Sequence, residues 1–217
     1  MKKTVAALVA VSSIGFASSN PKPVPLVIGD GMDNTGVYLG AGISAMSTRL
    51  SSVSRDIFNE KAGQDRLGNA VFLGGYMINN YLAVEGRFAV NITDEDKVTM
   101  DSQWSLFLKP MYKFEDDEDQ ANGRNYFAIY GLLGYGGIDL TGTNQVNADI
   151  SDTGFQWGIG FSYTFRETAS DGQYQYKDSW TIYADYTMLG SDMDGLYYTG
   201  KDKVDADAFT VGLTYKF

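Results

Sequence analysis

The chain has 217 residues, enough for one domain or a very small two-domain protein, and its 17 Lys and Arg against 27 Asp and Glu give a net charge of −10. This acidic balance argues against nucleic acid as a partner, because contacts with phosphates require a basic surface. The absence of Cys and His excludes a disulfide framework, a lipoprotein anchor, and the commonest general base and metal ligand.

The first element is a predicted secretory signal peptide at residues 1–17. Lys2 and Lys3 form its positive end, about a dozen apolar or small residues follow, and small residues precede a cut after Ala17. No run in the chain approaches the roughly 18 apolar residues of a transmembrane helix, so a mature protein in a membrane has to cross it with strands. Residues 18–35 contain alternate prolines, which predict an extended periplasmic lead-in.

Residues 36–217 show the period-two alternation of β-strands, together with many Gly and aromatic residues and few Pro. The clearest strand is 153–165, where six apolar or aromatic residues share one face: Phe155, Trp157, Ile159, Phe161, Tyr163 and Phe165. The last strand, 209–217, repeats this pattern with Phe209, Val211, Leu213, Tyr215 and Phe217. Weaker alternation predicts strands at 37–46, 70–78, 81–91, 103–114, 126–135 and 180–188, with a two-residue turn at Asn79-Asn80. The prediction is an all-β protein, an eight-stranded antiparallel up-and-down transmembrane β-barrel.

Alternation alone also fits a soluble lipocalin-like barrel, whose apolar face points inward. Three features favour the membrane. First, six charged residues share the face opposite the apolar set: Glu85, Arg87, Lys109, Lys113, Asp185 and Lys216. Second, the aromatic residues gather in two rows, as expected at two membrane interfaces. The row near the termini holds Tyr76, Tyr81, Tyr112, Phe114, Tyr126, Phe127, Phe165, Trp180, Tyr215 and Phe217, and the other row holds Trp104, Phe155, Trp157 and Phe209. Third, the connections near 48–69, 92–102, 136–152 and 189–207 are long and polar, like external loops.

The final segment 208–217 resembles the C-terminal β-signal of bacterial outer-membrane proteins, which ends in a terminal Phe. Residues 130–137 (YGLLGYGG) look like the Gly-rich fifth-strand region of small OmpA-type and porin-family barrels, here without a peptidoglycan-binding domain. This resemblance implies a location in the outer membrane of a Gram-negative bacterium. It also implies contact with outer-membrane lipid and lipopolysaccharide, and recognition of the strand with Phe209, Val211, Leu213, Tyr215 and Phe217 by the barrel assembly machinery.

The families of outer-membrane barrel enzymes rely on a catalytic His, so no enzymatic activity and no cofactor are expected of this chain. Glu85, Arg87, Lys109 and Asp185 form a predicted lumen charge cluster, interpreted as charges that neutralise one another in a narrow interior. Eight strands leave room for little more than their own side chains. The inner glycines Gly154, Gly158, Gly160 and Gly212 are predicted to make room for Tyr130 and Tyr183.

Three functions follow, in order of preference. The first is a structural or surface-interaction role with a side-chain-filled lumen. The second is a narrow porin-like channel for ions or small solutes, and the third is a soluble periplasmic lipocalin-like carrier. Acidic loops are a candidate site for divalent cations, at residues 115–119 and at Asp192, Asp194, Asp202, Asp205 and Asp207, although neither matches an EF-hand spacing and a solvated flexible loop is the preferred interpretation.

Overall fold

The computed structural model describes residues 35–53, 64–93, 98–114, 125–142, 149–166, 179–197 and 200–217, all within one compact unit, Met32–Phe217. Eight strands follow one another: β1 (Gly36–Leu50), β2 (Gln64–Asn79), β3 (Leu82–Asn91), β4 (Val98–Phe114), β5 (Tyr126–Gly142), β6 (Asp149–Arg166), β7 (Ser179–Tyr197) and β8 (Gly200–Lys216). The described part contains no helix long and apolar enough to cross a bilayer. The predicted signal peptide and, apart from Thr35, the predicted lead-in lie outside the described residues.

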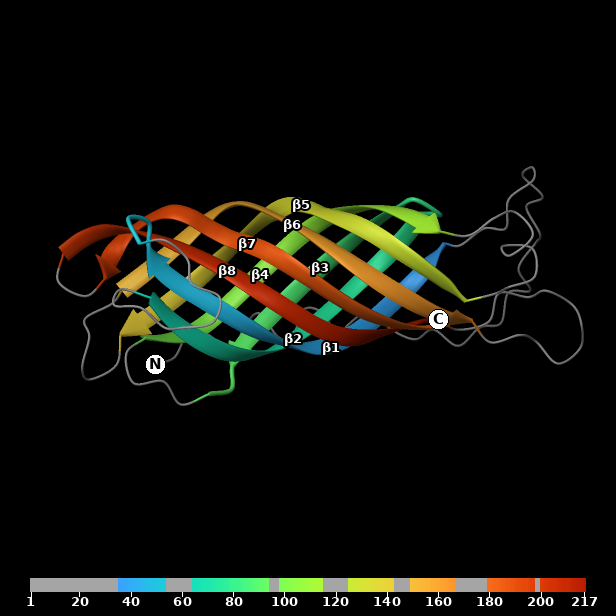
Figure 1. Cartoon of the computed structure of the whole chain (residues 1–217), viewed down its shortest axis with the longest axis horizontal. Coiled ribbons are helices and arrows are strands. Elements are labelled where there is room, and N and C mark those ends of the chain that lie inside the picture. Colours follow the sequence, from blue (N-terminus) through green and yellow to red (C-terminus); the bar gives the residue numbers. More distant parts are fainter. Residues whose placement is uncertain are drawn as a thin grey trace, which may run out of the picture. The chain divides into compact units, whose positions relative to one another are not determined.

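The strands form a closed antiparallel barrel in which each strand pairs with the next and β8 pairs with β1 (Figure 1). This confirms the predicted up-and-down topology. Closure satisfies the backbone groups of both end strands, which an open sheet would leave exposed. The β2–β3 turn lies one residue later than predicted, because Asn79 pairs with Leu82.

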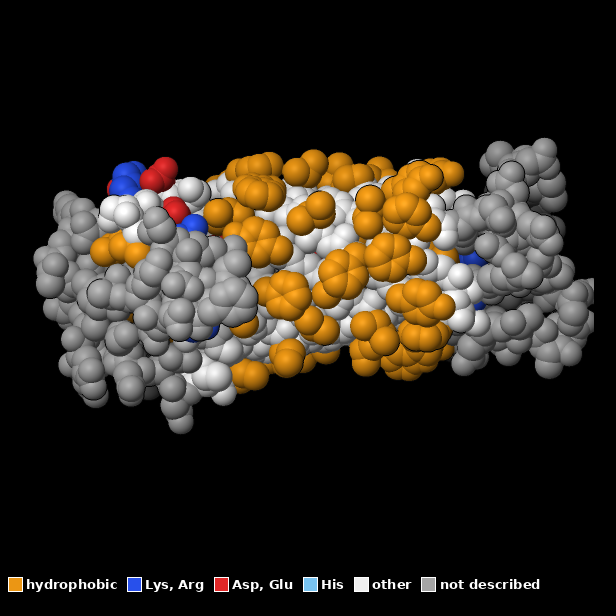
Figure 2. Space-filling view, viewed as in Figure 1, with side chains coloured by type: hydrophobic (Ala, Val, Ile, Leu, Met, Phe, Trp, Pro, Cys, Tyr) orange, Lys and Arg blue, Asp and Glu red, His pale blue; other side chains and the backbone are white. Residues whose placement is uncertain are grey.

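The apolar face of each strand points away from the barrel axis. Ile43, Phe155 and Ile159 are among the most exposed large side chains, at 66%, 64% and 62%, whereas Glu85 and Arg87 are buried inside. Figure 2 shows an exposed apolar band across the face in view, and exposed large apolar side chains come from β1, from β2 and from β4–β8. This orientation matches a barrel surrounded by lipid, and the soluble lipocalin-like alternative is therefore wrong.

The two predicted aromatic rows lie on the outer face with one exception. Tyr126 is buried inside the barrel, where the Lys113 ammonium and the Arg166 guanidinium lie over its ring at 4.8 and 4.4 Å from the centroid. Its side chain alternates with Phe127, which is exposed, so strand parity rather than position along the strand decides its direction. Of the predicted assembly-signal residues, Phe209, Val211, Leu213 and Tyr215 share the outward face of β8, and exposed Phe217 follows the end of the strand.

The strands are longer than predicted, because they continue through segments that the sequence suggested were external loops. Beyond the aromatic row farthest from the C terminus, the two faces exchange character. On β5, outward Tyr135 is followed by outward Asp139 and Thr141, while Ile138 and Leu140 point inward and are buried. We call this part of the wall the distal segment; it comprises 46–50, 64–69, 98–103, 137–142, 149–154, 189–197 and 200–208.

An apolar cluster, here called the apolar layer, lies inside the distal segment and extends to Val71 and Ala89 next to it. It contains buried side chains from all eight strands: Met46, Leu67, Val71, Ala89, Val98, Met100, Ile138, Leu140, Ile150, Leu189, Met193, Val204, Ala206 and Ala208. The outer surface at this end carries acidic and basic side chains next to the apolar band (Figure 2). The barrel therefore has the polarity of a membrane protein over one part of its length and of a soluble barrel over the other.

Candidate functional site: the lumen charge cluster

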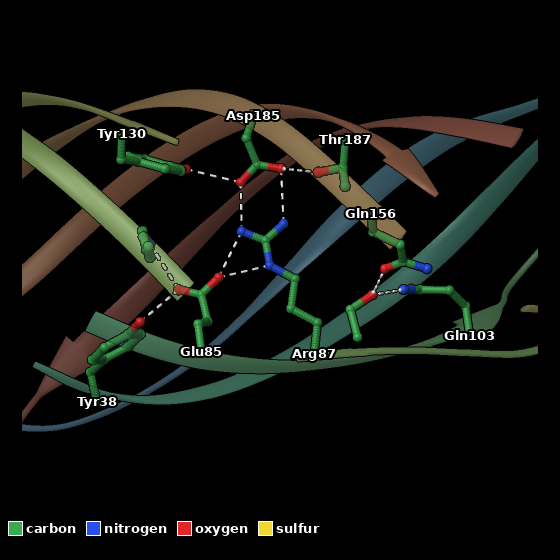
Figure 3. A network of polar contacts seen from close by, with 10 residues as sticks. Tyr38, Glu85, Arg87, Gln103, Tyr130, Gln156, Asp185 and Thr187 are labelled. Carbon is green, nitrogen blue, oxygen red and sulfur yellow. Dashed lines mark hydrogen bonds and ion pairs between the residues drawn. The ribbon is translucent and has the colours of Figure 1, made fainter. Parts of the chain in front are cut away.

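The cluster is centred on Arg87, whose guanidinium lies between two carboxylates (Figure 3). Its two terminal nitrogens donate to the two oxygens of Asp185 at 2.9 and 2.7 Å, and its Nε donates to Glu85 Oε1 at 2.7 Å. Glu85 and Asp185 are almost completely buried. A bidentate guanidinium–carboxylate pair is among the stronger hydrogen-bonded ion pairs in proteins.

Lys109 and two tyrosines complete the hydrogen bonding of the carboxylates. Lys109 Nζ and the Tyr38 hydroxyl donate to Glu85 Oε2 at 2.8 and 2.7 Å, and the Tyr130 hydroxyl donates to Asp185 Oδ2 at 2.9 Å. The Lys109 ammonium also lies 4.2 Å from the centre of the Tyr130 ring. Each buried charge thus has an opposite charge and further polar partners, which offsets the cost of removing it from water.

Strand parity explains why these side chains meet. Glu85 and Arg87 are two residues apart on β3 and therefore point to the same side of the wall. Lys109 comes from the neighbouring strand β4, where it pairs with Ala83. Asp185 comes from β7, which is not a neighbour of β3, so the Arg87–Asp185 pair crosses the lumen. The structure brings together all four residues of the predicted cluster.

The tyrosines inside the lumen pack against glycines, as predicted for two of the four inner positions. A Cβ at Gly160 would lie 2.5 Å from the Tyr130 ring, and one at Gly212 would lie 2.6 Å from the Tyr183 hydroxyl. The prediction was wrong for the other two. Gly158 faces the β7 backbone and the Thr187 side chain, and a Cβ at Gly154 would have no heavy atom of the described residues within 4 Å.

Gly160→Ala is expected to lower the free energy of unfolding by about 1–3 kcal/mol, because the added methyl group overpacks the contact between Tyr130 and Asp185. Gly154→Ala is the matched control on the same strand and face, and should change the free energy of unfolding by less than about 0.5 kcal/mol. Urea unfolding of the two variants in detergent micelles measures the difference. Equal effects would contradict this packing.

Sequence reasoning missed the polar residues that flank the cluster. Gln103 and Ser105 are hydrogen-bonded to each other, Ser105 donates to Gln156 Oε1, and Gln156 Nε2 donates to the Leu189 carbonyl at 2.9 Å. Figure 3 shows this chain beside Arg87. Their inward parity was available in the sequence, but uncharged polar residues are also common on exposed faces, so the pattern carried no specific signal.

Two small cavities lie on either side of the cluster. One, of about 50 Å³, lies toward the C-terminal end of the barrel and is lined by Tyr38, Lys109, Met111, Ser162 and other side chains. We call it the vestibule. The other, of about 20 Å³, is lined by Arg87, polar side chains and part of the apolar layer, and has room for roughly one water.

The acidic residues predicted near 189–207 lie on strands β7 and β8 rather than in a flexible loop. Asp205 and Asp207 form ion pairs with Arg49, and Asp194 pairs with Lys203. Among the described side chains, no group of three or more Asp, Glu, His or Cys is arranged to hold a metal ion. The acidic run at 115–119 and the side chain of Asp202 lie outside the described residues, so the cation site there stays a prediction.

Comparison with solved structures finds small outer-membrane barrels. The attachment invasion locus protein Ail of Yersinia pestis, solved in complex with the heparin analogue sucrose octasulfate, is 17% identical with a TM-score of 0.48; the match covers 84% of this chain and 99% of that one. Neisserial surface protein A is 17% identical with a TM-score of 0.45, covering 84% and 97%. The N-terminal barrel of Pseudomonas aeruginosa OprF is 10% identical with a TM-score of 0.40, covering 82% and 97%.

No curated protein matches the chain. The family model described as "Outer membrane protein beta-barrel domain" matches residues 5–217, nearly the whole sequence. This match agrees with the closed eight-stranded barrel and its outward apolar band. The protein is located in the outer membrane of a Gram-negative bacterium, and the chain belongs to the outer membrane protein β-barrel domain family.

Proposed function

We propose that this barrel is a non-conducting membrane protein that presents its distal segment at the cell surface for contact with other molecules. The observation that carries the proposal is the exchange of polarity between the two faces. On β8, Phe209 is the outward apolar residue nearest the distal end, and the strand extends beyond it to Gly200. Asp205 and Lys203 lie on its outer face, and Asp207 is buried there in an ion pair with Arg49. The stretch 200–208 of this strand, tilted as strands are in other barrels, reaches roughly 20 Å beyond the apolar band.

A projecting wall of paired strands is a stable platform, because its apolar interior holds it together without lipid. Its outer surface carries exposed polar residues such as Asp101, Thr141, Asp149 and Ser151. Hydroxyl groups and carboxylates on neighbouring strands bind one another, as in the pair Thr141–Asp101 at 2.6 Å. These features suit a rigid surface that contacts soluble or surface-bound molecules.

A lumen filled by side chains is part of the proposal. The charge cluster crosses the lumen, the apolar layer takes side chains from all eight strands, and the two cavities beside the cluster are about 20 and 50 Å³. A continuous path for hydrated ions needs more space than this. The chain also has no His and no Cys, so we propose no catalytic activity.

The partners that we propose inside the membrane follow from the outer wall. The apolar band and its aromatic rows would contact outer-membrane lipid and the lipid portion of lipopolysaccharide. The strand β8, with Phe209, Val211 and Leu213 outward and Phe217 after its end, would be recognised by the barrel assembly machinery.

Cysteine labelling on intact cells tests the projection, because the chain has no native Cys. Thr141→Cys is expected to react with a membrane-impermeant maleimide added outside the cells, since Thr141 is exposed beyond the apolar band. Tyr112→Cys, in the aromatic row at the opposite end of the wall, is expected to react only after the outer membrane is permeabilised. Equal external labelling of both positions would contradict the projection.

Planar bilayers test the non-conducting lumen. The purified protein is expected to show no discrete current steps. The alternative of a narrow channel is favoured by one observation, the charged residues that cross the lumen, and stable single-channel currents from the wild-type protein would support that alternative and overturn the proposal.

Surface contact is tested with cells that express the protein and are applied to other cells or coated surfaces. A variant in which a tight turn replaces 193–204 removes the longest part of the distal segment and leaves the rest of the wall. It is expected to reduce attachment while barrel folding, seen as heat-dependent gel mobility, stays unchanged. Full attachment by this variant, at equal surface amounts, would count against a surface-contact role for this hairpin.

A further inference from the structure

We infer that the barrier that closes the lumen is the apolar layer of the distal segment, and that the lumen charge cluster is not the barrier. The inference rests on the proposed non-conducting lumen and adds where it is closed. It assigns the barrier to buried methionine and aliphatic side chains, chief among them Met46, Met100 and Met193.

The first argument is the composition of the layer. All eight strands contribute a buried apolar side chain to it, so every side of the barrel wall takes part in the layer. Met46 comes from β1, Met100 from β4 and Met193 from β7, and each is at most 3% exposed. A constriction lined only by apolar groups excludes ions by excluding water, because an ion cannot keep its hydration shell there.

The second argument is that the charge cluster borders a small cavity on each side, and that polar side chains take part in the lining of both cavities. The vestibule reaches Lys109 and Tyr38 from the C-terminal end of the barrel. The smaller cavity reaches Arg87 from the other side and is bounded by Ser44 and Asn69. The Asn69 side-chain oxygen is buried and has no hydrogen-bond partner among the residues that the structure describes, which is the environment of a buried water.

Cavities with polar groups on both sides make the cluster a weak barrier. Water on both sides can solvate side chains that move apart, whereas the methionine and aliphatic side chains of the apolar layer offer no polar partner to an entering ion. Buried Thr48 and Asp65 lie on the same inner face, and the Asp65 carboxylate accepts a hydrogen bond from the Val98 N–H at 3.1 Å. Neutralising the cluster should therefore leave the lumen closed. Opening the apolar layer should join the small cavity to the outside.

The first experiment compares three variants in planar bilayers. The first is a triple variant with Met46→Ser, Met100→Ser and Met193→Ser. It is expected to produce discrete current steps that the wild type lacks. Met77→Ser with Met111→Ser makes the same chemical change beside the vestibule and is expected to stay silent. Arg87→Gln with Asp185→Asn removes the charges that cross the lumen and keeps hydrogen-bonding groups, and is also expected to stay silent.

The second experiment does not depend on the folding of a multiple variant. Met111→Cys in the vestibule and Met100→Cys in the apolar layer are single changes in a chain without native Cys. In detergent, a small charged thiol reagent can reach both ends of the folded barrel. It is expected to modify Met111→Cys fully. In the same time Met100→Cys should remain unmodified, and it should react once urea unfolds the protein.

The outcomes separate the two proposals. Currents from the wild type would overturn the non-conducting lumen itself. A silent wild type with currents from the Arg87 and Asp185 variant would overturn only the inference about the barrier. Modification of Met100→Cys as fast as Met111→Cys would also overturn it, because the apolar layer would then be accessible to water. The inference about the barrier would also be overturned if the triple methionine-to-serine variant folds and shows no current.

Discussion

Replacing Arg87 with alanine is expected to lower the free energy of unfolding by about 3–5 kcal/mol, as measured by urea unfolding in lipid vesicles. The guanidinium is the hydrogen-bond partner of both Glu85 and Asp185, and its removal leaves two carboxylates in a buried site. Lys109 remains to compensate Glu85, but within the described part of the chain Asp185 retains only the hydroxyl groups of Tyr130 and Thr187. Most of the loss should therefore come from the unpaired Asp185 carboxylate.

A second substitution tests this origin of the loss. Arg87→Ala with Asp185→Asn should recover a substantial part of the stability, because a neutral amide is less costly to bury than a carboxylate. Lys203→Ala is the control for an exposed pair, since Lys203 and Asp194 are 54% and 88% exposed, and its removal should cost about 0–1 kcal/mol. A loss for Arg87→Ala no larger than that for Lys203→Ala would show that the lumen is hydrated and the cluster structurally unimportant.

The members of this cluster were predictable, but their contacts were not. Alternation alone places Glu85, Arg87, Lys109 and Asp185 on the inner face, because each lies opposite an apolar residue set. The pairing of Arg87 with Asp185 joins residues 98 positions apart on strands that are not neighbours. It depends on the register accumulated around the barrel, which no local pattern contains.

Tyr126 shows where local pattern and parity gave different answers. Its position at the end of a strand suggests an aromatic residue at the membrane interface. Because β5 is apolar on both faces, hydrophobicity does not identify which face of this strand points outward. In the structure, Tyr126 shares the inner face with Ala128 and Tyr130. Large side chains fit inside at such positions because the facing strand supplies glycine, as Gly160 does for Tyr130.

The distal segment was missed although its pattern was present in the sequence. Val204, Ala206 and Ala208 alternate with charged residues at period two, which is a strand pattern with the usual faces exchanged. The end of outward apolar residues was interpreted as the end of each strand. It marks instead the edge of the membrane, because a strand can leave the lipid and remain paired when its inner face supplies an apolar core.

Lysine substitutions along β5 test this edge directly, and the expected losses differ sharply between three positions of one strand. Leu133→Lys places a charge on the lipid-facing wall and should cost about 2–4 kcal/mol. Thr141→Lys is exposed beyond the edge and should change the free energy of unfolding by less than about 0.5 kcal/mol. Leu140→Lys places a charge in the apolar layer, where Leu140 is 1% exposed, and should be the most damaging of the three.

Comparing a lipid bilayer with detergent distinguishes the two causes of lost stability, which are a charge facing lipid and a charge inside the apolar layer. Urea unfolding is measured in lipid vesicles and in detergent micelles, whose apolar region adapts to an outward charge more readily than a bilayer. The cost of Leu133→Lys should fall in micelles, whereas that of Leu140→Lys should not, because the apolar layer is made by the protein itself. A cost for Thr141→Lys close to that for Leu133→Lys would place lipid around the distal segment. The surface role would then lose its support, because the strands would not project from the membrane.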